Sequence, residues 1–518
     1  MPKQNGKLRP LGIPVMWDRI IQQCILQVLE PIGEAKFHVR SNGFRPNRST
    51  EHALAQCYKM AQQQNLHFVV DIDIKGFFDN VNHGKLLKQI WAMGIQDKNL
   101  LCIISKMLKA KVVMPDGTTV EVNKGTPQGG ILSPLLSNIV LNELDWWIAS
   151  NREEMPTRTS INEIRANGTL DRSNKYKALR KSNLKECFMV RYADDFKIFC
   201  PDYKTATRIF HATKLWLRDR LHLEISEEKS KIVNLKKEYS EFLGFEMKVI
   251  KHGNKYKVKS HICKKAKERI ANELKEIIKQ IKYPKGDLDE LRKIGLYNSK
   301  VIGIHQYYKI ATMVSQDLSE IAYQIKGSLE NNKLKKRISK TGATQGYIKE
   351  VYGQSQQLRY IRNTPLVPLA YITHQSPMFK RREINKYTPS GRAFIHKQLE
   401  SVDLGTLKWL MQNPVKQRSV EYNDNRLSLY SAQKGRCAVT GNLLMPFDIH
   451  RHHKVPLDSG GTDAYSNLVL ISREVHELIH AKLSEAINAY MTKLNLTQPQ
   501  LRKLNKLRII IGNEEIIE

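Results

Sequence analysis

The chain has 518 residues, and 84 Lys+Arg against 51 Asp+Glu give a formal net charge of +33. Its 41% hydrophobic residues can build several buried cores, which excludes a wholly disordered chain. No apolar run approaches the roughly 18 residues of a membrane span, and the N-terminus lacks the apolar core of a signal peptide. The charge predicts a polyanionic partner, with nucleic acid favoured over an anionic membrane surface.

The first half of the chain predicts an α/β or α+β domain. From residue 1 to about 248, short β-rich apolar runs such as Phe68–Val70 alternate with segments of helical length. Residues 151–185 are polar and weakly periodic, which indicates an inserted loop or helical hairpin rather than a domain boundary.

The pattern becomes helical after residue 254. Apolar residues recur at three- and four-residue steps through Ile270, Leu274, Ile277 and Ile281, and Tyr283–Asp287 supplies a stop signal. A helical tail is expected over residues 483–507. We therefore expect four parts: an α/β part at 1–248, a helical part at 258–375, a basic connector at 376–429 and a small module at 430–518.

Acidic residues occur inside two strand-like runs of the first part. Asp71 and Asp73 follow Phe68–Val70, and Asp194 and Asp195 lie between two apolar runs at the tip of an expected hairpin. Clustered carboxylates suit Mg²⁺, and two such ions about 4 Å apart support nucleotidyl transfer. The alternatives are an ordinary Asp-Asp turn and an ion-paired strand residue, and either piece alone favours them.

A Gly/Pro-rich turn, Gly125–Pro134, leads into an apolar helix and lets the backbone approach a ligand closely. With this segment the chain resembles a reverse transcriptase, and in particular a group II intron-encoded one. Seven blocks, covering nearly half of the chain, follow the family's order: Lys7–Pro14, Ser41–Pro46, Asp73–Asp79, Gly125–Pro134, Tyr192–Asp195, Ser226–Lys231 and Phe242–Phe245.

The resemblance implies a right-hand polymerase with fingers and palm, followed by a helical thumb or maturase domain. It implies that two Mg²⁺ ions are held by Asp73, Asp194 and Asp195, with help from the Ile74 carbonyl. Residues expected to bind the deoxynucleotide are Lys3, Arg9, Phe78 and Gln128. Without the resemblance, Lys3 and Arg9 would be taken as solvated surface charges.

The C-terminal part carries a second motif. His476 and His480 stand four residues apart on an expected helix, so both imidazoles face the same way, and His452 and His453 precede them on an expected hairpin. With Asn467, this order resembles an HNH endonuclease, a ββα-metal fold. The resemblance implies His453 as general base, Asn467 as a structural residue, and one divalent ion, Mg²⁺ or similar, held by His452, His476 and His480.

The family's cysteine pairs are missing from this module. Cys437 stands at one such place, but Thr440 occupies its partner position. A structural zinc ion is therefore not expected, and the module is expected to be held by apolar packing alone. The seven cysteines of the chain form no Cys-x-x-Cys pair, which fits reduced thiols in the bacterial cytoplasm or an organelle.

The expected partners are intron RNA, an RNA template, target DNA and deoxynucleotides, with no membrane. Phosphate contacts are expected from exposed basic residues of the helical part, although a solvated face is an equal alternative for each: Lys264, Lys265, Lys333, Lys335, Lys336 and Arg337. The expected function is RNA-directed DNA synthesis, help in intron splicing, and target cleavage that primes synthesis. The family's extension before Lys7–Pro14 is missing, so the alternative is a splicing-only maturase with an inactive, N-terminally truncated polymerase.

Overall fold

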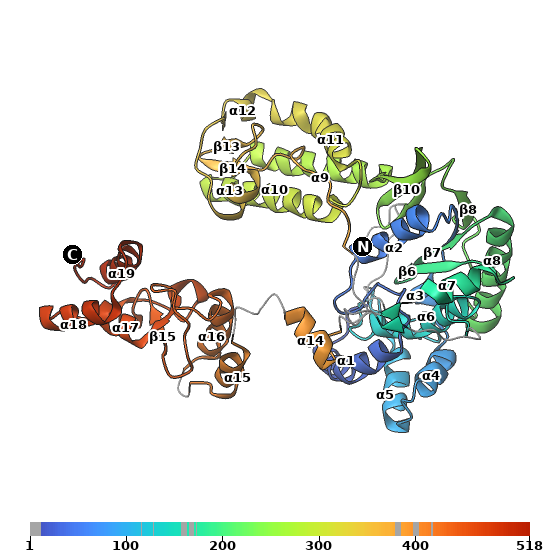
Figure 1. Cartoon of the computed structure of the whole chain (residues 1–518), viewed down its shortest axis with the longest axis horizontal. Helices are drawn as coiled ribbons and strands as arrows, with labels where there is room; N and C mark the ends of the chain where they lie inside the picture. The colour runs from blue at the N-terminus through green and yellow to red at the C-terminus, as the bar shows by residue number, and fades with distance from the viewer. Residues whose placement is uncertain are drawn as a thin grey trace. The chain divides into compact units, whose positions relative to one another are not determined.

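The computed structural model of the chain describes residues 12–114, 116–127, 129–156, 163–164, 170–171, 173–378, 385–396, 403–415 and 418–517. Contacts divide the chain into two compact units, Met1–Arg382 and Glu383–Glu518 (Figure 1). Within these described ranges, no helix is both long enough and apolar enough to cross a membrane.

The first unit is built around a four-stranded antiparallel sheet with strand order β6-β7-β1-β8. Its strands are β1 (Phe68–Ile72), β6 (Phe188–Tyr192), β7 (Asp195–Cys200) and β8 (Lys231–Asn234). Val69 belongs to the apolar core on one face, whereas Val70 and Ile72 belong to the core on the other. The sheet therefore separates two cores, because side chains of a strand alternate between its faces.

Helices cover both faces of this sheet. Residues of α2 bury with Val69, whereas α6 and α8 bury with Val70. The helices are α1 (Met16–Lys36), α2 (Thr50–Tyr58), α3 (Phe77–Asn80), α4 (His83–Ala92), α5 (Lys98–Leu108), α6 (Ser133–Ser150), α7 (Ser173–Arg180) and α8 (Tyr203–Trp216). Two π-helical turns extend α2 and α8, η1 (Lys59–Gln63) and η2 (Leu217–Leu221), and two short hairpins complete this part: β2 (Val112–Val113) with β3 (Thr119–Val120), and β4 (Glu163–Ile164) with β5 (Leu170–Asp171).

A second sheet follows the first in the chain and precedes the helical part. Its order is β11-β10-β9, with β9 (Ser240–Phe242), β10 (Phe245–His252) and β11 (Lys255–Ile262). Gly253 has a φ of +60° in the two-residue turn between β10 and β11, a conformation that glycine adopts without strain. One face of the sheet, including Phe245 and Val249, is buried in the core that also contains Val69.

The predicted amphipathic helix is confirmed. It is α9 (Lys264–Lys282), its residues Ile270, Leu274 and Ile281 are buried, and it ends before Pro284. Other elements of this helical part are α10 (Asp287–Tyr308), α11 (Val314–Leu329), α12 (Asn332–Lys335) and α13 (Gly346–Tyr352), with a small sheet of β12 (Ile338–Ser339), β13 (Arg359–Ile361) and β14 (Thr364–Leu366). Leu274 and Val69 lie in one core, so the two expected domains pack as a single compact unit.

The second unit has a two-stranded sheet covered by helices. Its elements are α14 (Pro389–His396), α15 (Leu404–Gln412), α16 (Val420–Ala432), β15 (Ile449–His453), η4 (Leu457–Ser459), η5 (Tyr465–Asn467), β16 (Leu468–Ser472), α17 (Arg473–His480), α18 (Ser484–Leu494) and α19 (Gln498–Ile510). Leu410 and Leu429 share a core with Leu470. The unit is therefore larger than the expected module at 430–518, because α15 and α16 bury apolar side chains against β16.

Candidate active sites of the two units

The carboxylates of the first unit meet where β1 ends and β7 begins. The antiparallel register pairs Ile72 with Phe196, so one further step sets Asp73 opposite Asp195. Asp195 also pairs with Tyr192 across the turn that contains Asp194. Three acidic residues from two separate stretches of chain thus come together at one end of the sheet.

Their charges act on one another. Although the Asp195 side chain reaches solvent, protein atoms crowd its other sides, and this desolvation raises its pKa to about 6. Lys197 opposes the rise, whereas the charges of Asp71, Asp194 and Asp73 add to it. A carboxylate cluster of this kind gains from a bound cation, since a cation removes the mutual repulsion.

The turn that carries Asp194 rests on a close backbone contact. Ala193 has a φ of +58°. Gly43 lies directly behind it, where a side-chain Cβ would come 2.2 Å from the Ala193 amide nitrogen. The Asn42 amide donates to the Arg191 carbonyl (2.8 Å), and Asn138 Nδ2 donates to the Gly43 carbonyl (2.9 Å). The Ser41–Pro46 block is therefore a support for the acidic turn.

A buried arginine holds the same turn from the other side. Arg191 and Asp145 are both fully buried and form a two-pronged ion pair, with Nε–Oδ1 2.8 Å and a second contact of 2.5 Å. The Arg191 guanidinium also donates to Asn138 Oδ1 (3.0 Å) and to the Ala193 carbonyl (2.8 Å). Sequence reasoning missed this network. Its available signals were an arginine inside an apolar strand and an aspartate inside the apolar helix α6.

Asp73 is positioned by the Ser226–Lys231 block. The Ser226 amide donates to the Asp73 carbonyl (2.7 Å), and the Asp73 amide donates to Ser230 Oγ (3.2 Å). Lys229 Nζ lies 3.4 Å from the Asp73 carboxylate. Asp71, two residues earlier, instead pairs with Lys197 (2.6 Å) and is the ion-paired strand residue among the acids.

Phe78 lies beside the Gly125 turn. The Thr126 amide donates to the Phe78 carbonyl, and the Gly125 amide donates to the Val81 carbonyl, both at 2.7 Å. Gly125 has a φ of +93°, and a Cβ there would come 2.9 Å from the Phe78 carbonyl oxygen. The predicted nucleotide-binding residues Lys3, Arg9 and Gln128 lie outside the described residues, and the Ile74 side chain is buried.

The Phe242–Phe245 turn borders a cavity of about 480 Å³. Leu243 and Gly244 have φ values of +53° and +80°, and the Tyr307 hydroxyl donates to the Leu243 carbonyl (3.0 Å). Arg269 and Lys265 of α9 also line the cavity. The turn is therefore joined to the helices that follow it in the chain.

The predicted phosphate-binding residues of the helical part are mostly exposed. Lys264 and Lys265 open α9, and Lys333, Lys335 and Lys336 are exposed around α12. Arg337 differs, because its guanidinium pairs with buried Glu290 and donates to the carbonyls of Ile281 and Lys282. Arg337 thus caps the C-terminal end of α9.

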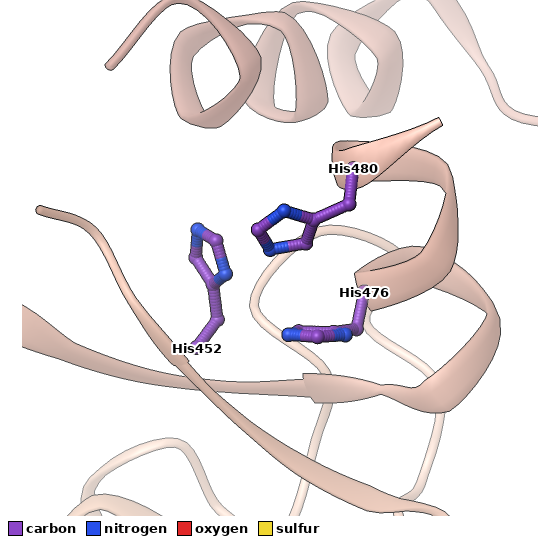
Figure 2. A group of neighbouring side chains, drawn as sticks. All are labelled: His452, His476 and His480. Atoms are coloured by element: carbon purple, nitrogen blue, oxygen red, sulfur yellow. The ribbon is translucent and has the colours of Figure 1, made fainter. Parts of the chain in front are cut away.

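In the second unit, three imidazoles converge (Figure 2). His452 comes from β15, and His476 and His480 come from α17. One nitrogen of each lies within 4.8 Å of the others. His452 is 2% exposed, and its buried Nε2 has no hydrogen-bond partner among the described residues, which fits a nitrogen that binds a metal ion.

These imidazoles are held neutral. Burial, together with His476, His480 and His453, lowers the pKa of His452 to about 3. Burial and the neighbouring histidines lower the pKa of His476 to about 4. Neutral imidazole is the metal-binding form, so three nitrogen donors are available near pH 7.

His453 points away from this cluster. Its Nε2 lies 3.0 Å from Asp463 Oδ1, and its ring stacks on Tyr422 with centroids 5.9 Å apart. Asp463 also accepts from Ser419 Oγ (2.6 Å). Sequence reasoning missed Asp463, which lies in a polar loop with no distinguishing pattern around it.

Asn467 spans the loop after His453. Its side chain exchanges hydrogen bonds with the Val455 amide (2.9 Å) and carbonyl (3.0 Å), and it donates to the Thr462 carbonyl (2.9 Å). Cys437 lies in the core, where its sulfur accepts from the Ser472 amide (3.5 Å). Apolar packing and these polar contacts therefore order the module around the histidines.

Comparisons with known proteins identify a family for the chain. The family model "Reverse transcriptase (RNA-dependent DNA polymerase)" matches residues 1–247. The group II intron-encoded protein LtrA of Lactococcus lactis subsp. cremoris is 32% identical over 421 residues, covering 70% of this chain and 69% of that protein. Protein YkfC of Escherichia coli is 34% identical over 238 residues, covering 45% and 61%.

A yeast protein, the putative COX1/OXI3 intron 2 protein of Saccharomyces cerevisiae, is 27% identical over 370 residues, covering 62% of this chain and 43% of that protein. The shared region of LtrA reaches well beyond the polymerase blocks of residues 1–247. The chain therefore belongs to the family of group II intron-encoded reverse transcriptases and maturases.

Proposed function

We propose that the first unit synthesises DNA on an RNA template, using Asp73, Asp194 and Asp195. The observation that supports the proposal is the register of β1 and β7, which, continued one step past Ile72 and Phe196, brings Asp73 to Asp195 beside the Asp194 turn. Carboxylate oxygens are the ligands that Mg²⁺ prefers, and the Ile74 carbonyl is a further candidate. When bound, Mg²⁺ would lower the cost of charge on the attacking hydroxyl and the leaving pyrophosphate.

The chain's own residues would position the reactants. The Phe78 ring, held through the contact of its carbonyl with Thr126, would bound the sugar of the incoming nucleotide. An aromatic wall here has no room for a ribose 2′-hydroxyl and so would favour deoxynucleotides. The Phe242–Phe245 turn, fixed by Tyr307, would hold the primer end.

Primer extension tests this assignment. With poly(rA)/oligo(dT), dTTP and Mg²⁺, we expect extension by the wild-type chain and a loss of at least 100-fold in Asp194→Asn. Asp219→Asn is the matched control, because Asp219 is an exposed acid whose ion pair, among the described residues, is with its neighbour Arg218. Equal extension by Asp194→Asn and Asp219→Asn contradicts the assignment.

We also propose that the second unit is a metal-dependent nuclease that cuts target DNA and so supplies the primer for synthesis. The supporting observation is the buried, partnerless Nε2 of His452 beside His476 and His480. Three nitrogen donors without a carboxylate suit Zn²⁺ or a similar transition metal better than Mg²⁺. Such an ion would stabilise charge on the scissile phosphate.

His453 would act as the general base. Its imidazole would take a proton from the attacking water, and Asp463, through the 3.0 Å contact with Nε2, would orient the ring. Nicking of a plasmid that carries the intron insertion site tests this. We expect nicking to be lost in His453→Ala while metal content, measured by elemental analysis, is unchanged. Retained nicking in His453→Ala contradicts the role of His453.

Maturase activity is the third part of the proposal. The net charge of +33 and the exposed lysines of α9 and α12 support binding of intron RNA through phosphates. We expect the logarithm of RNA affinity to fall steeply with the logarithm of salt concentration. A nearly flat salt response contradicts phosphate-driven binding.

A further inference from the structure

The hairpin of β10 and β11, whose position Figure 1 marks with the β10 label, carries basic side chains on one face. Every second cross-strand pair from Lys248 to the tip belongs to this face: Lys248 with Lys259, Ile250 with Lys257, and His252 with Lys255. Because side chains alternate between the faces of a strand, these residues share one face. Val249 and Val258 point to the opposite face and are buried in the core, so the basic face is the one towards solvent.

The four lysines of this face have no carboxylate partner among the described residues. Lys248 Nζ lies instead 4.8 Å from the centroid of the Tyr239 ring. The nearest acid in the register is Glu246, one row inward, opposite His261. Elsewhere in this unit exposed lysines do find acids, as Lys214 does with Glu227 at 2.6 Å.

This arrangement is unfavourable for the isolated protein. Lys248 and Lys259 are directly opposite each other, and like charges in that position destabilise a strand pair. Lysines on an edge strand can serve to block strand-to-strand aggregation, which would account for β11. From Lys248 onwards β10 pairs with β11 alone, because β9 pairs only with Phe245–Met247, so edge protection serves both strands but leaves the repulsion between Lys248 and Lys259 in place. A polyanion on this face would relieve the repulsion.

We propose that the solvent face of the β10–β11 hairpin binds the phosphate backbone of a structured RNA that is not the template–primer duplex. The hairpin tip lies about 24 Å along β10 from the Phe242–Phe245 turn, at roughly 3.4 Å per residue. RNA held at the tip lies beyond a primer end held at that turn, and unchanged primer extension in the variant below distinguishes it from the template–primer duplex. The inference rests on the proposed RNA binding of the chain and assigns it a surface.

The test removes the four charges and measures salt-dependent binding. The variant carries Lys→Gln at 248, 255, 257 and 259. The matched control carries Lys→Gln at 88, 98, 106 and 109, which are exposed lysines of α4, α5 and the residue after α5. The probe is a 30-base-pair RNA stem-loop, with Kd measured across a series of KCl concentrations. We expect the slope of log affinity against log salt to shrink by about 3 in the hairpin variant, and by less than 1 in the control.

Two further readouts keep the result interpretable. Without RNA, the hairpin variant is expected to unfold at a temperature at least equal to wild type, since a repulsion has been removed. Its extension of poly(rA)/oligo(dT) is expected to be unchanged. The proposal is overturned if the hairpin variant keeps the salt slope of wild type, or if the control variant loses as much slope as the hairpin variant. It is also overturned if the hairpin variant loses primer extension to the same degree as RNA binding. A wild-type chain without polymerase activity whose RNA binding still depends on the hairpin refutes the proposed polymerase and leaves this inference standing.

Discussion

At the residue scale, the acidic turn depends on a charge that solvent does not reach. Arg191 is fully buried, pairs with Asp145 and donates to the Ala193 carbonyl within the turn. Removing one partner of a buried ion pair leaves the other charge uncompensated, whereas replacing both by apolar residues is tolerated far better. Comparing the single with the double substitution therefore distinguishes the contribution of the pair to stability from its contribution to positioning the turn.

We expect Arg191→Ala to lower the free energy of unfolding by about 3–5 kcal/mol, measured by urea denaturation. The double variant R191M/D145L should recover most of that stability but not primer extension, because the Ala193 carbonyl and Asn138 still lack their donor. Arg218→Ala, which breaks an exposed pair, is the control and should leave the free energy of unfolding nearly unchanged. Full extension by the double variant contradicts the positioning role.

The histidine cluster makes stability depend on pH when metal is absent. In the folded chain the pKa of His452 is lowered to about 3 and that of His476 to about 4, against 6.5 for the ordinary side chain. Below pH 6.5 these histidines are therefore protonated in the unfolded state but remain neutral in the folded state. Stability is fully present above pH 6.5 and falls as pH drops towards 4, by up to about 1.4 kcal/mol per pH unit for each histidine.

Hydrogen exchange in chelator checks this expectation. Protection of the β16–α17 segment should fall from pH 7 to pH 5 after correction for intrinsic exchange rates. His452→Leu should flatten the dependence, since it removes the most strongly shifted imidazole. Saturating Zn²⁺ should restore protection in wild type but not in the variant. A pH-independent protection in metal-free wild type contradicts neutral burial of these histidines.

Some residues of both sites were predictable and others were not, for a physical reason. Asp73, Asp194 and the histidines lie in short runs whose chemistry is visible locally. Asn138 and Asp145 act on Arg191 from about 50 residues away, so only tertiary packing reveals them. Asp463 contacts His453 across a polar loop that has no periodicity.

At the element scale, the backbone of the Gly125 turn contacts the backbone of Phe78 and positions it. Gly125 and Gly94 have nearly equal φ values, +93° and +96°, but only at Gly125 would a Cβ meet protein atoms, 2.9 Å from the Phe78 carbonyl oxygen. Gly125→Ala and Gly94→Ala thus carry the same backbone penalty and differ in the clash.

We expect Gly125→Ala to lower kcat/KM for dTTP incorporation by about tenfold or more, because the Phe78 segment must move. Gly94→Ala should change kcat/KM by less than about twofold. Both variants should lose a similar amount of stability from the unfavourable φ. Steady-state primer extension and thermal unfolding measure the two effects. Equal kinetics in both variants contradicts the coupling of this turn to Phe78.

The elements differ in how well the sequence predicts them. The helix α9 was predictable because its apolar residues repeat at helical spacing and Pro284 follows its end. The extent of the second unit was not, because α15 and α16 have weak local signals and join the core through Leu410 and Leu429 only after folding. Likewise, Arg337 belongs to a basic run but is held by Glu290, a contact between distant parts of the helical region.

At the scale of the whole molecule, the two compact units are expected to respond separately to metal. Calorimetry of the full chain should resolve two transitions. Removing transition metal with a chelator should lower the transition of the second unit and leave that of the first unchanged, because the histidine site lies within the second unit alone. His476→Ala should reproduce the chelator's effect. A shift of both transitions contradicts independent units.

We expect Asp73 and the Asp194–Asp195 turn to share a bound cation, and iron-dependent cleavage can locate that cation. Fe²⁺ in place of Mg²⁺, with ascorbate and peroxide, cuts the backbone near the ion. We predict cuts close to both residue 73 and residue 194, suppressed by excess Mg²⁺ and absent at both positions in Asp194→Asn. Cuts near only one of these segments, or cuts at residue 73 that persist in Asp194→Asn, would contradict a shared site.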